Sequence, residues 1–193
     1  MTNKATDNQA IDRRAILRAG ALGGLLLSSF AAAPAQATSF VMPRDGAFRV
    51  AFRNQHTGES FSGAYRIGDR YLPDAFSKIN SVLRDFRTNE VFPIDPRIID
   101  IIYAVHTKTG ANKPFEVLSG YRSPRTNAML RRTGGGGVAK NSLHMTGQAI
   151  DLRLPGYKTS YIRDIGKQVR AGGVGYYPGS NFVHLDTGKV RFW

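Results

Sequence analysis

The spacing of apolar residues changes along this chain, and this change restricts the fold more than any other feature of the sequence. A period of two occurs in two early segments, at Phe48, Val50 and Phe52 and again at Phe61, Gly63, Tyr65 and Ile67. Such alternation predicts strands with one buried face. Because the polar sequence Gln55-His56-Thr57-Gly58 separates the two segments, they are expected to form an N-terminal hairpin.

After Pro73 the apolar spacing becomes that of a helix. An i, i+3, i+4 pattern predicts an amphipathic helix of about four turns, and its apolar residues are Phe76, Ile79, Val82, Leu83 and Phe86. A second helix is expected to begin with Asp95 as its N-cap and Pro96 in its first turn, because both residue types favour these positions.

Short strands and short helices are expected in the second half of the chain. Strands are predicted at Phe115–Leu118, at Ala149–Leu154 and within Gly173–Trp193, and helices are predicted up to Leu130 and over Ser160–Val169. Helices grouped before a mostly antiparallel C-terminal sheet indicate the α+β class, rather than a doubly wound parallel sheet.

The composition restricts the chemistry that the chain can carry. Its 193 residues are 41% hydrophobic, which suffices for one packed domain with an appendage. The absence of cysteine excludes a disulfide scaffold, an iron–sulfur cluster and a thiol nucleophile. A catalytic metal would therefore need carboxylates and histidines, and the four histidines are His56, His106, His144 and His184.

The chain is strongly basic, with 27 Lys and Arg against 14 Asp and Glu. A positive surface favours anionic partners, among them lipid and cell-wall polymers whose peptides carry free carboxylates. No basic helix with interleaved stacking aromatic residues is visible, so a nucleic-acid partner is not expected. The oligomeric state does not follow from the sequence.

The N-terminal segment resembles an export signal. Arg13-Arg14 precedes an apolar run from Ala19 to Ala33 and the Ala-x-Ala sequence at Ala35-Gln36-Ala37. The run is shorter than the roughly 20 residues that span a bilayer, so no membrane span is expected after cleavage. We predict a twin-arginine-like signal peptide over 1–37, with Asp12 in place of the usual Ser or Thr. A plain secretory signal or a retained anchor is the alternative.

The remaining residues, 38–193, are expected to form one domain in the periplasm or cell envelope, with a hairpin and helices over 38–113 and a catalytic core over 114–193. A glycine-rich segment from Gly134 to Lys140 approaches the P-loop pattern. It lacks that pattern's second glycine at Ala139, and Asn141 stands where a magnesium-binding Ser or Thr is required. We interpret it as a connecting loop at the rim of the active site.

Two separate segments carry the strongest chemical signal. Asp151 lies in an alternating strand whose other face carries Ile150 and Leu152, so its side chain is expected to point toward a cleft. His144 precedes this strand, and His184 shares a face of a later strand with Asp186. If the two strands are neighbours, His144, Asp151 and His184 converge into a zinc site with an open position. From spacing alone, a hydrogen-bonded structural histidine is the more usual arrangement, and Asp151 could instead pair with an arginine.

The motif Ser142-x-His144-x-x-Gly147-x-Ala149-x-Asp151, followed by Phe182-Val183-His184-x-Asp186, resembles the M15 family of zinc D-Ala-D-Ala peptidases. Ser119-Gly120-Tyr121-Arg122-Ser123 also fits this family. The resemblance covers roughly 115–193 and is strongest to the exported DUF882 group, which includes a murein endopeptidase. It implies a Hedgehog/DD-peptidase-like fold.

The resemblance also implies roles for individual residues. His144, Asp151 and His184 match the family's zinc ligands, and Arg122 matches an arginine that binds a substrate carboxylate. The position of Ser142 implies either a hydrogen bond near the metal or a role in shaping the turn. The pattern departs from the family at Asn181, where several members have a general-base glutamate. Asp186 is the nearest carboxylate, and it either acts as the base or holds a ligand in place.

These observations predict an exported zinc metallopeptidase that hydrolyses amide bonds in peptidoglycan stem peptides, at cross-links. A D,D-carboxypeptidase that removes terminal D-Ala is the alternative within enzymes. A peptidoglycan-binding module without turnover is the alternative from another class, and the absence of a glutamate at position 181 keeps it open.

Overall fold

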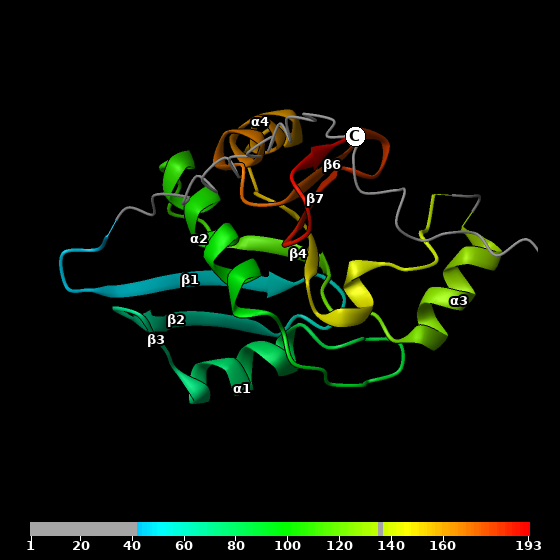
Figure 1. Ribbon diagram of the computed structural model, residues 1–193, viewed down its shortest axis with the longest axis horizontal. Coiled ribbons are helices and arrows are strands. Elements are labelled where there is room, and N and C mark those ends of the chain that lie inside the picture. Colours follow the sequence, from blue (N-terminus) through cyan, green and yellow to red (C-terminus); the bar gives the residue numbers. More distant parts are fainter. Residues whose placement is uncertain (1–41, 135–136) are drawn as a thin grey trace, which may run out of the picture. The chain divides into compact units, whose positions relative to one another are not determined.

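The computed structural model describes residues 42–134 and 137–193. The expected signal peptide over 1–37 lies outside the described residues. An eight-stranded sheet in the order β3-β2-β1-β4-β5-β7-β6-β8 organises the described part (Figure 1). Its strands are β1 (Ala47–Asn54), β2 (Ser60–Ile67), β3 (Arg70–Tyr71), β4 (Phe115–Ser119), β5 (Ala149–Arg153), β6 (Gly173–Tyr177), β7 (Phe182–Asp186) and β8 (Arg191–Phe192).

The sheet is mostly antiparallel, as predicted, and combines with helices in a mixed fold. Parallel pairing occurs between β1 and β4 and between β6 and β8. The sheet is not confined to the C-terminal segment, which corrects the expected layout. Phe52–Asn54 pairs with Phe115–Val117, so the predicted N-terminal hairpin joins the same sheet. This pairing supplies partners for backbone N–H and C=O groups that an isolated hairpin would leave exposed along its edge.

The helices are α1 (Pro73–Val82), α2 (Pro96–Thr109), α3 (Pro124–Thr133) and α4 (Thr159–Val169). The side chain of Asp95 accepts a hydrogen bond from the Arg97 N–H, which confirms the predicted cap of α2. The prediction for α1 was wrong at its end, because Leu83 and Phe86 lie beyond the helix. The Leu83 carbonyl accepts from the Tyr121 N–H instead, and Asp85 pairs with Glu90, so the backbone turns away.

The core lies between the sheet and these helices. Helix α2 packs on β1 and against α4, α4 packs on β6 and β7, and α1 packs on β2, whereas α3 lies at one end of the fold (Figure 1). Ile98, Ile99, Ile150 and Leu152 are completely buried, and burial of each such side chain contributes roughly 1.5–3 kcal/mol. The other face of β5 is thereby left to carry Asp151.

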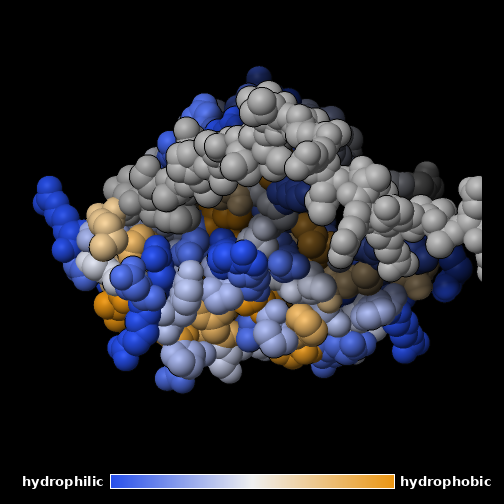
Figure 2. Space-filling view, in the orientation of Figure 1, coloured by the Kyte–Doolittle hydropathy of each residue, from blue (hydrophilic) through white to orange (hydrophobic). Residues whose placement is uncertain are grey.

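The visible face of the described residues is mainly hydrophilic (Figure 2). Hydrophilic side chains spread over the face shown in Figure 2, and hydrophobic ones appear between them in small groups. Within residues 42–134 and 137–193, no helix has the length and apolar character needed to cross a membrane.

One glycine lets the chain turn between two of the candidate site residues. The short 3-10 helix η1 (Leu143–Thr146) ends at Gly147, which has φ +67°. A Cβ atom at this position would overlap the Pro93 carbonyl oxygen. Left-handed backbone and tight packing therefore both require glycine before β5.

Replacing Gly147 with alanine should destabilise the fold more than the same change at Gly110. Gly110 has a similar φ of +64°, but a Cβ there meets nothing within 4 Å. Gly110→Ala should cost about 1–2 kcal/mol for the left-handed conformation, and Gly147→Ala should add about 1–3 kcal/mol of overpacking. Urea unfolding followed by circular dichroism measures both losses, and equal losses would contradict this account.

Candidate metal centre

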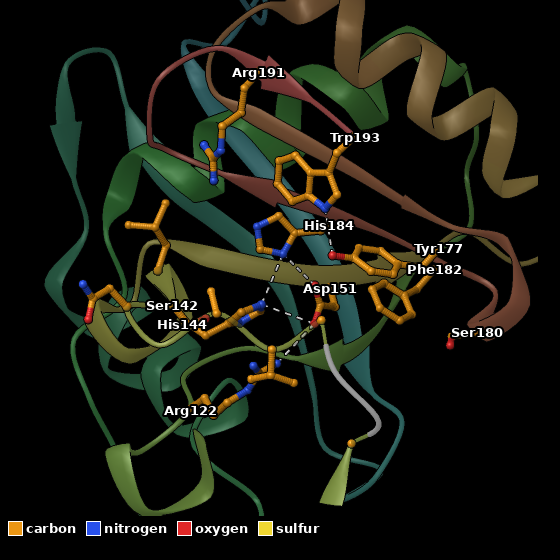
Figure 3. Close-up of a pocket in the computed structure, with 16 residues that line it drawn as sticks. Arg122, Ser142, His144, Asp151, Tyr177, Ser180, Phe182, His184, Arg191 and Trp193 are labelled. Atoms are coloured by element: carbon orange, nitrogen blue, oxygen red, sulfur yellow. Dashed lines mark hydrogen bonds and ion pairs between the residues drawn. The ribbon is translucent and has the colours of Figure 1, made fainter. Parts of the chain in front are cut away.

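Three predicted site residues converge although they come from separate elements. His144 lies in η1, Asp151 in β5 and His184 in β7, and Asp151 is paired directly with His184 in the sheet. One ligand atom from each residue lies within 4.8 Å of the others. All three residues are buried, and Figure 3 shows their side chains pointing toward one another.

The hydrogen bonds around the two imidazoles determine which nitrogens carry lone pairs. His144 Nδ1 lies 2.7 Å from the Gly120 carbonyl oxygen, and His184 Nε2 lies 3.0 Å from Asp186 Oδ2. Because both oxygens only accept, these nitrogens carry the hydrogens. When both rings are neutral, the other two nitrogens, His144 Nε2 and His184 Nδ1, therefore present lone pairs to each other at 3.2 Å.

The carboxylate of Asp151 completes this cluster of electron-rich atoms. Its oxygens lie 2.8 Å from His184 Nδ1 and 3.3 Å from His144 Nε2. Two lone pairs and an anionic group at these distances repel one another unless a cation lies among them. Ligands of a tetrahedral cation with bonds of roughly 2.0–2.2 Å are about 3.3–3.6 Å apart, so modest movement accommodates such an ion.

The pKa values also show that the cluster attracts positive charge. Burial raises the pKa of the Asp151 carboxyl, but His144 and His184 outweigh this effect and hold the pKa below its usual value. Burial lowers the pKa of His184, but its hydrogen bonds to Asp151 and Asp186 raise the pKa to about 9. Without a metal, a proton on His184 supplies the cation that the cluster needs.

Asp186 lies on the opposite side of His184 from this cluster. Its carboxylate is completely buried and accepts five hydrogen bonds, from His184 Nε2, the Gly173 and Gly188 N–H groups and two nitrogens of Arg191. These bonds hold the pKa of Asp186 well below its ordinary value, although burial opposes them. The carboxylate is thus a fully engaged acceptor that fixes the tautomer of His184.

Arg122 reaches the cluster from the loop before α3. Its Nη2 lies 3.6 Å from Asp151 Oδ2 and donates to Ser119 Oγ at 3.4 Å. Its buried Nε meets no acceptor among the described residues. Burial lowers the pKa of Arg122, and the guanidinium remains charged. Arg122 also lines the pocket beside the cluster, so its guanidinium is available to an acceptor bound there.

A pocket of about 520 Å³ opens beside the three converging residues. Ser142 and the described part of the glycine-rich segment, with Gly134 and Gly137, line one side of it. Tyr177, Phe182 and Trp193 line another, as the labelled side chains in Figure 3 show. Among the described residues that line the pocket, Asp151 is the only acidic one; Asn181 is exposed on the turn before β7.

Two histidines lie outside this centre. His56 stacks on Phe86 and contacts the Leu118 carbonyl, and His106 contacts the Lys113 carbonyl. Sequence reasoning missed Arg191 and the aromatic side of the pocket. The Thr187-Gly188 turn after β7 was a usable signal, because a return strand after it brings Arg191 back to Asp186.

Residues 44–193 match the sequence model of a family described as "Peptidoglycan L,D-endopeptidase MepK". The chain therefore belongs to this family, which confirms the resemblance seen in its motifs.

Individual relatives agree with this assignment. Peptidoglycan L,D-endopeptidase MepK of Escherichia coli strain K12 is 43% identical over 184 residues, covering 94% of this chain and 97% of that protein. Probable peptidoglycan L,D-endopeptidase MepK of Haemophilus influenzae is 45% identical over 145 residues, covering 75% and 77%. The crystal structure of Serratia marcescens L-Ala D-Glu endopeptidase ChiX gives a TM-score of 0.32 at 21% identity, over 40% of this chain and 62% of that one. At this TM-score the likeness carries no argument.

Zinc should stabilise the metal-free protein through His144. At a free concentration 100 times the dissociation constant, binding to the native state alone adds about 2.7 kcal/mol of stability. The unfolding temperature should rise by several degrees in the wild type and not in His144→Ala. His106→Ala, outside the cluster, should keep the full zinc-dependent rise. Scanning calorimetry with and without zinc makes the comparison, and an equal rise in His144→Ala would refute the site.

Asp186→Asn should weaken metal binding, although Asp186 contacts His184 Nε2 and not the Nδ1 atom that faces the ion. The amide nitrogen of asparagine cannot accept the hydrogen bonds that the carboxylate accepts, so His184 loses its orientation, and metal affinity should fall about 10–100-fold. Asp164→Asn, at an exposed ion pair on α4, should leave the affinity unchanged. Competition with a chromogenic chelator measures both, and an unchanged affinity in Asp186→Asn would contradict the orienting role.

Proposed function

We propose that this chain is a zinc-dependent endopeptidase that hydrolyses amide bonds in peptidoglycan stem peptides, at cross-links. The observation that carries the proposal is the convergence of two imidazole lone pairs and one carboxylate beside a pocket. The names of its family and relatives support an endopeptidase acting at a bond between an L and a D centre. We also propose the Hedgehog/DD-peptidase-like fold that its motifs imply.

Zinc is the proposed ion because the donors are two imidazole nitrogens and one carboxylate oxygen, a set that catalytic zinc sites use. His144 would bind through Nε2, His184 through Nδ1 and Asp151 through its carboxylate. When bound, zinc polarises a carbonyl and lowers the pKa of a water molecule toward about 7. The Gly120 carbonyl and Asp186 accept from the other nitrogen of each ring, so His144 Nε2 and His184 Nδ1 are the nitrogens left to face an ion.

Arg122 is the proposed anchor for the substrate. Its Nη2 lies 3.6 Å from Asp151 and the residue lines the pocket, so an acceptor on the peptide can bind the guanidinium close to the reacting bond. Stem peptides carry carboxylates, and a guanidinium binds a carboxylate through two parallel hydrogen bonds. Ser142, which lines the same pocket, offers a further hydroxyl to the peptide backbone.

Asp186 is proposed to hold His184 rather than to accept a proton from water. Its oxygens already accept five hydrogen bonds, it is completely buried, and it does not line the pocket. A general base needs access to the proton that it abstracts. The orienting role is therefore the one that its contacts support.

The site of action is proposed to be the bacterial cell envelope, with removal of residues 1–37 during export. The basic segment, short apolar run and Ala-x-Ala sequence support this location. The excess of positive charge also suits a polymer whose peptides carry carboxylates.

Digestion of defined cross-linked muropeptide dimers tests the function. Zinc-loaded protein should split the dimer, a chelator should stop the reaction, and added zinc should restore it, as followed by mass spectrometry. Release of free D-Ala without splitting would indicate a D,D-carboxypeptidase instead. Binding of the dimer without any product would indicate a peptidoglycan-binding module.

Arg122→Lys should lower kcat/KM while preserving the charge. Lysine lacks the planar fork of donors, so one charge-assisted hydrogen bond is lost, which corresponds to about 10–100-fold in kcat/KM. Arg163→Lys, at the exposed pair with Asp164, serves as the matched control and should keep the wild-type value. Steady-state kinetics on the same dimer decides, and a wild-type kcat/KM in Arg122→Lys would remove this residue from the substrate site.

A further inference from the structure

We infer that the Tyr177 hydroxyl donates a hydrogen bond to the carbonyl oxygen of the bond being hydrolysed, and that Trp193 orients this hydroxyl. The inference rests on the proposed endopeptidase function and adds a substrate contact on the side of the pocket opposite Arg122. It starts from the aromatic side chains of β6, β7 and the C-terminal segment that line the pocket.

The sheet register places these aromatic residues beside a proposed zinc ligand. In the pairing of β6 with β7, Gly175 lies opposite His184 and Tyr177 lies opposite Phe182. Because residues two apart in a strand share a face, Tyr177 lies on the face of the sheet that carries His184. Tyr177, His184 and Asp151 line the same pocket, and the Tyr177 hydroxyl is joined to the Trp193 indole in Figure 3.

Gly175 makes room for the indole that holds this hydroxyl. A Cβ atom at Gly175 would lie only 2.7 Å from Cε2 and Cζ2 of Trp193, so the indole occupies the space that a side chain would fill. The Trp193 ring lies 5.4 Å from the His184 ring, centroid to centroid. The tryptophan therefore covers His184 and reaches Tyr177 at the same time.

The chemistry of the Trp193–Tyr177 hydrogen bond assigns its direction. Trp193 Nε1 lies 2.8 Å from the Tyr177 hydroxyl oxygen. An indole N–H can only donate, so the tyrosine oxygen accepts. The hydroxyl hydrogen of Tyr177 therefore remains available for donation to another acceptor. The Tyr177 hydroxyl donates no hydrogen bond to another described residue. A substrate oxygen in the pocket is thus a suitable partner for it.

Further contacts restrict the motion of the tyrosine and the tryptophan. The Tyr177 ring stacks on Phe182 with centroids 4.6 Å apart, and the Arg191 guanidinium carbon lies 4.8 Å from the Trp193 ring centroid. Arg191 also binds Asp186, which orients His184. The same residues thus fix both a proposed metal ligand and the hydroxyl. A donor held in place before the reaction stabilises the negative charge that develops on the carbonyl oxygen.

Tyr177→Phe tests the donor with the ring and its stacking preserved. Loss of one such donor should lower kcat on the cross-linked dimer about 100-fold, with a small change in KM, because the contact strengthens as charge develops. A phosphinate analogue of the scissile bond should bind about 100-fold more weakly by calorimetry. Zinc affinity should stay at the wild-type value. Tyr161→Phe, at an exposed tyrosine of α4, is the matched control and should change none of these.

Trp193→Phe tests the orienting role, because phenylalanine keeps an aromatic ring and lacks the N–H. It should lower kcat about 10-fold, the cost of about one neutral hydrogen bond. In Tyr177→Phe/Trp193→Phe, kcat should equal that of Tyr177→Phe alone, because the tryptophan acts through the hydroxyl.

Three outcomes would overturn the inference. The first is a Tyr177→Phe variant whose kcat and phosphinate affinity equal those of an active wild-type enzyme. This result would contradict the inference but not the endopeptidase function. The second is additive losses in the double variant. The third is a loss of kcat in Trp193→Phe that is accounted for by a lower zinc affinity of this variant. If the wild type cleaves no dimer even when loaded with zinc, the proposed function fails and this inference fails with it.

Discussion

Two imidazole lone pairs and one carboxylate face one another at about hydrogen-bond distance inside the protein, and the rest of the site depends on this concentration of negative charge. Such an arrangement is unfavourable in a buried setting unless a cation neutralises it. The His184 pKa, raised to about 9 despite burial, shows the same demand for positive charge. A proton on His184 therefore neutralises the cluster in part, and a divalent ion would neutralise it more fully.

The surroundings of the cluster maintain its geometry through groups far apart in the sequence. A backbone carbonyl at Gly120 sets the tautomer of His144, and Asp186 sets that of His184. Asp186 is in turn held by two backbone N–H groups and by Arg191 from the last strand. Because these supports come from the loop after β4, the start of β6, the turn after β7 and β8, the site forms only when these parts of the sheet are assembled.

Much of the fold could be predicted because its local signals are strong. The Asp95 cap and Pro96 placed the start of α2, and the alternation at Ile150 and Leu152 correctly assigned the buried face of β5. The end of α1 and the union of the hairpin with the rest of the sheet could not be predicted. Both depend on hydrogen bonds to distant backbone groups, Tyr121 N–H in one case and residues 115–117 in the other.

By itself the sequence determined which residue types could form a metal site, because without cysteine only histidines and carboxylates are available as ligands. Two separate motifs then indicated which histidines and which aspartate these are. Only the tertiary structure decided that β5 and β7 are neighbours, that Asp186 is buried and does not line the pocket, and that Trp193 and Tyr177 do line it. The physical reason is that a strand's pattern reports which of its faces is buried. Its pairing partner and the loop that closes over it depend on contacts between residues distant in sequence.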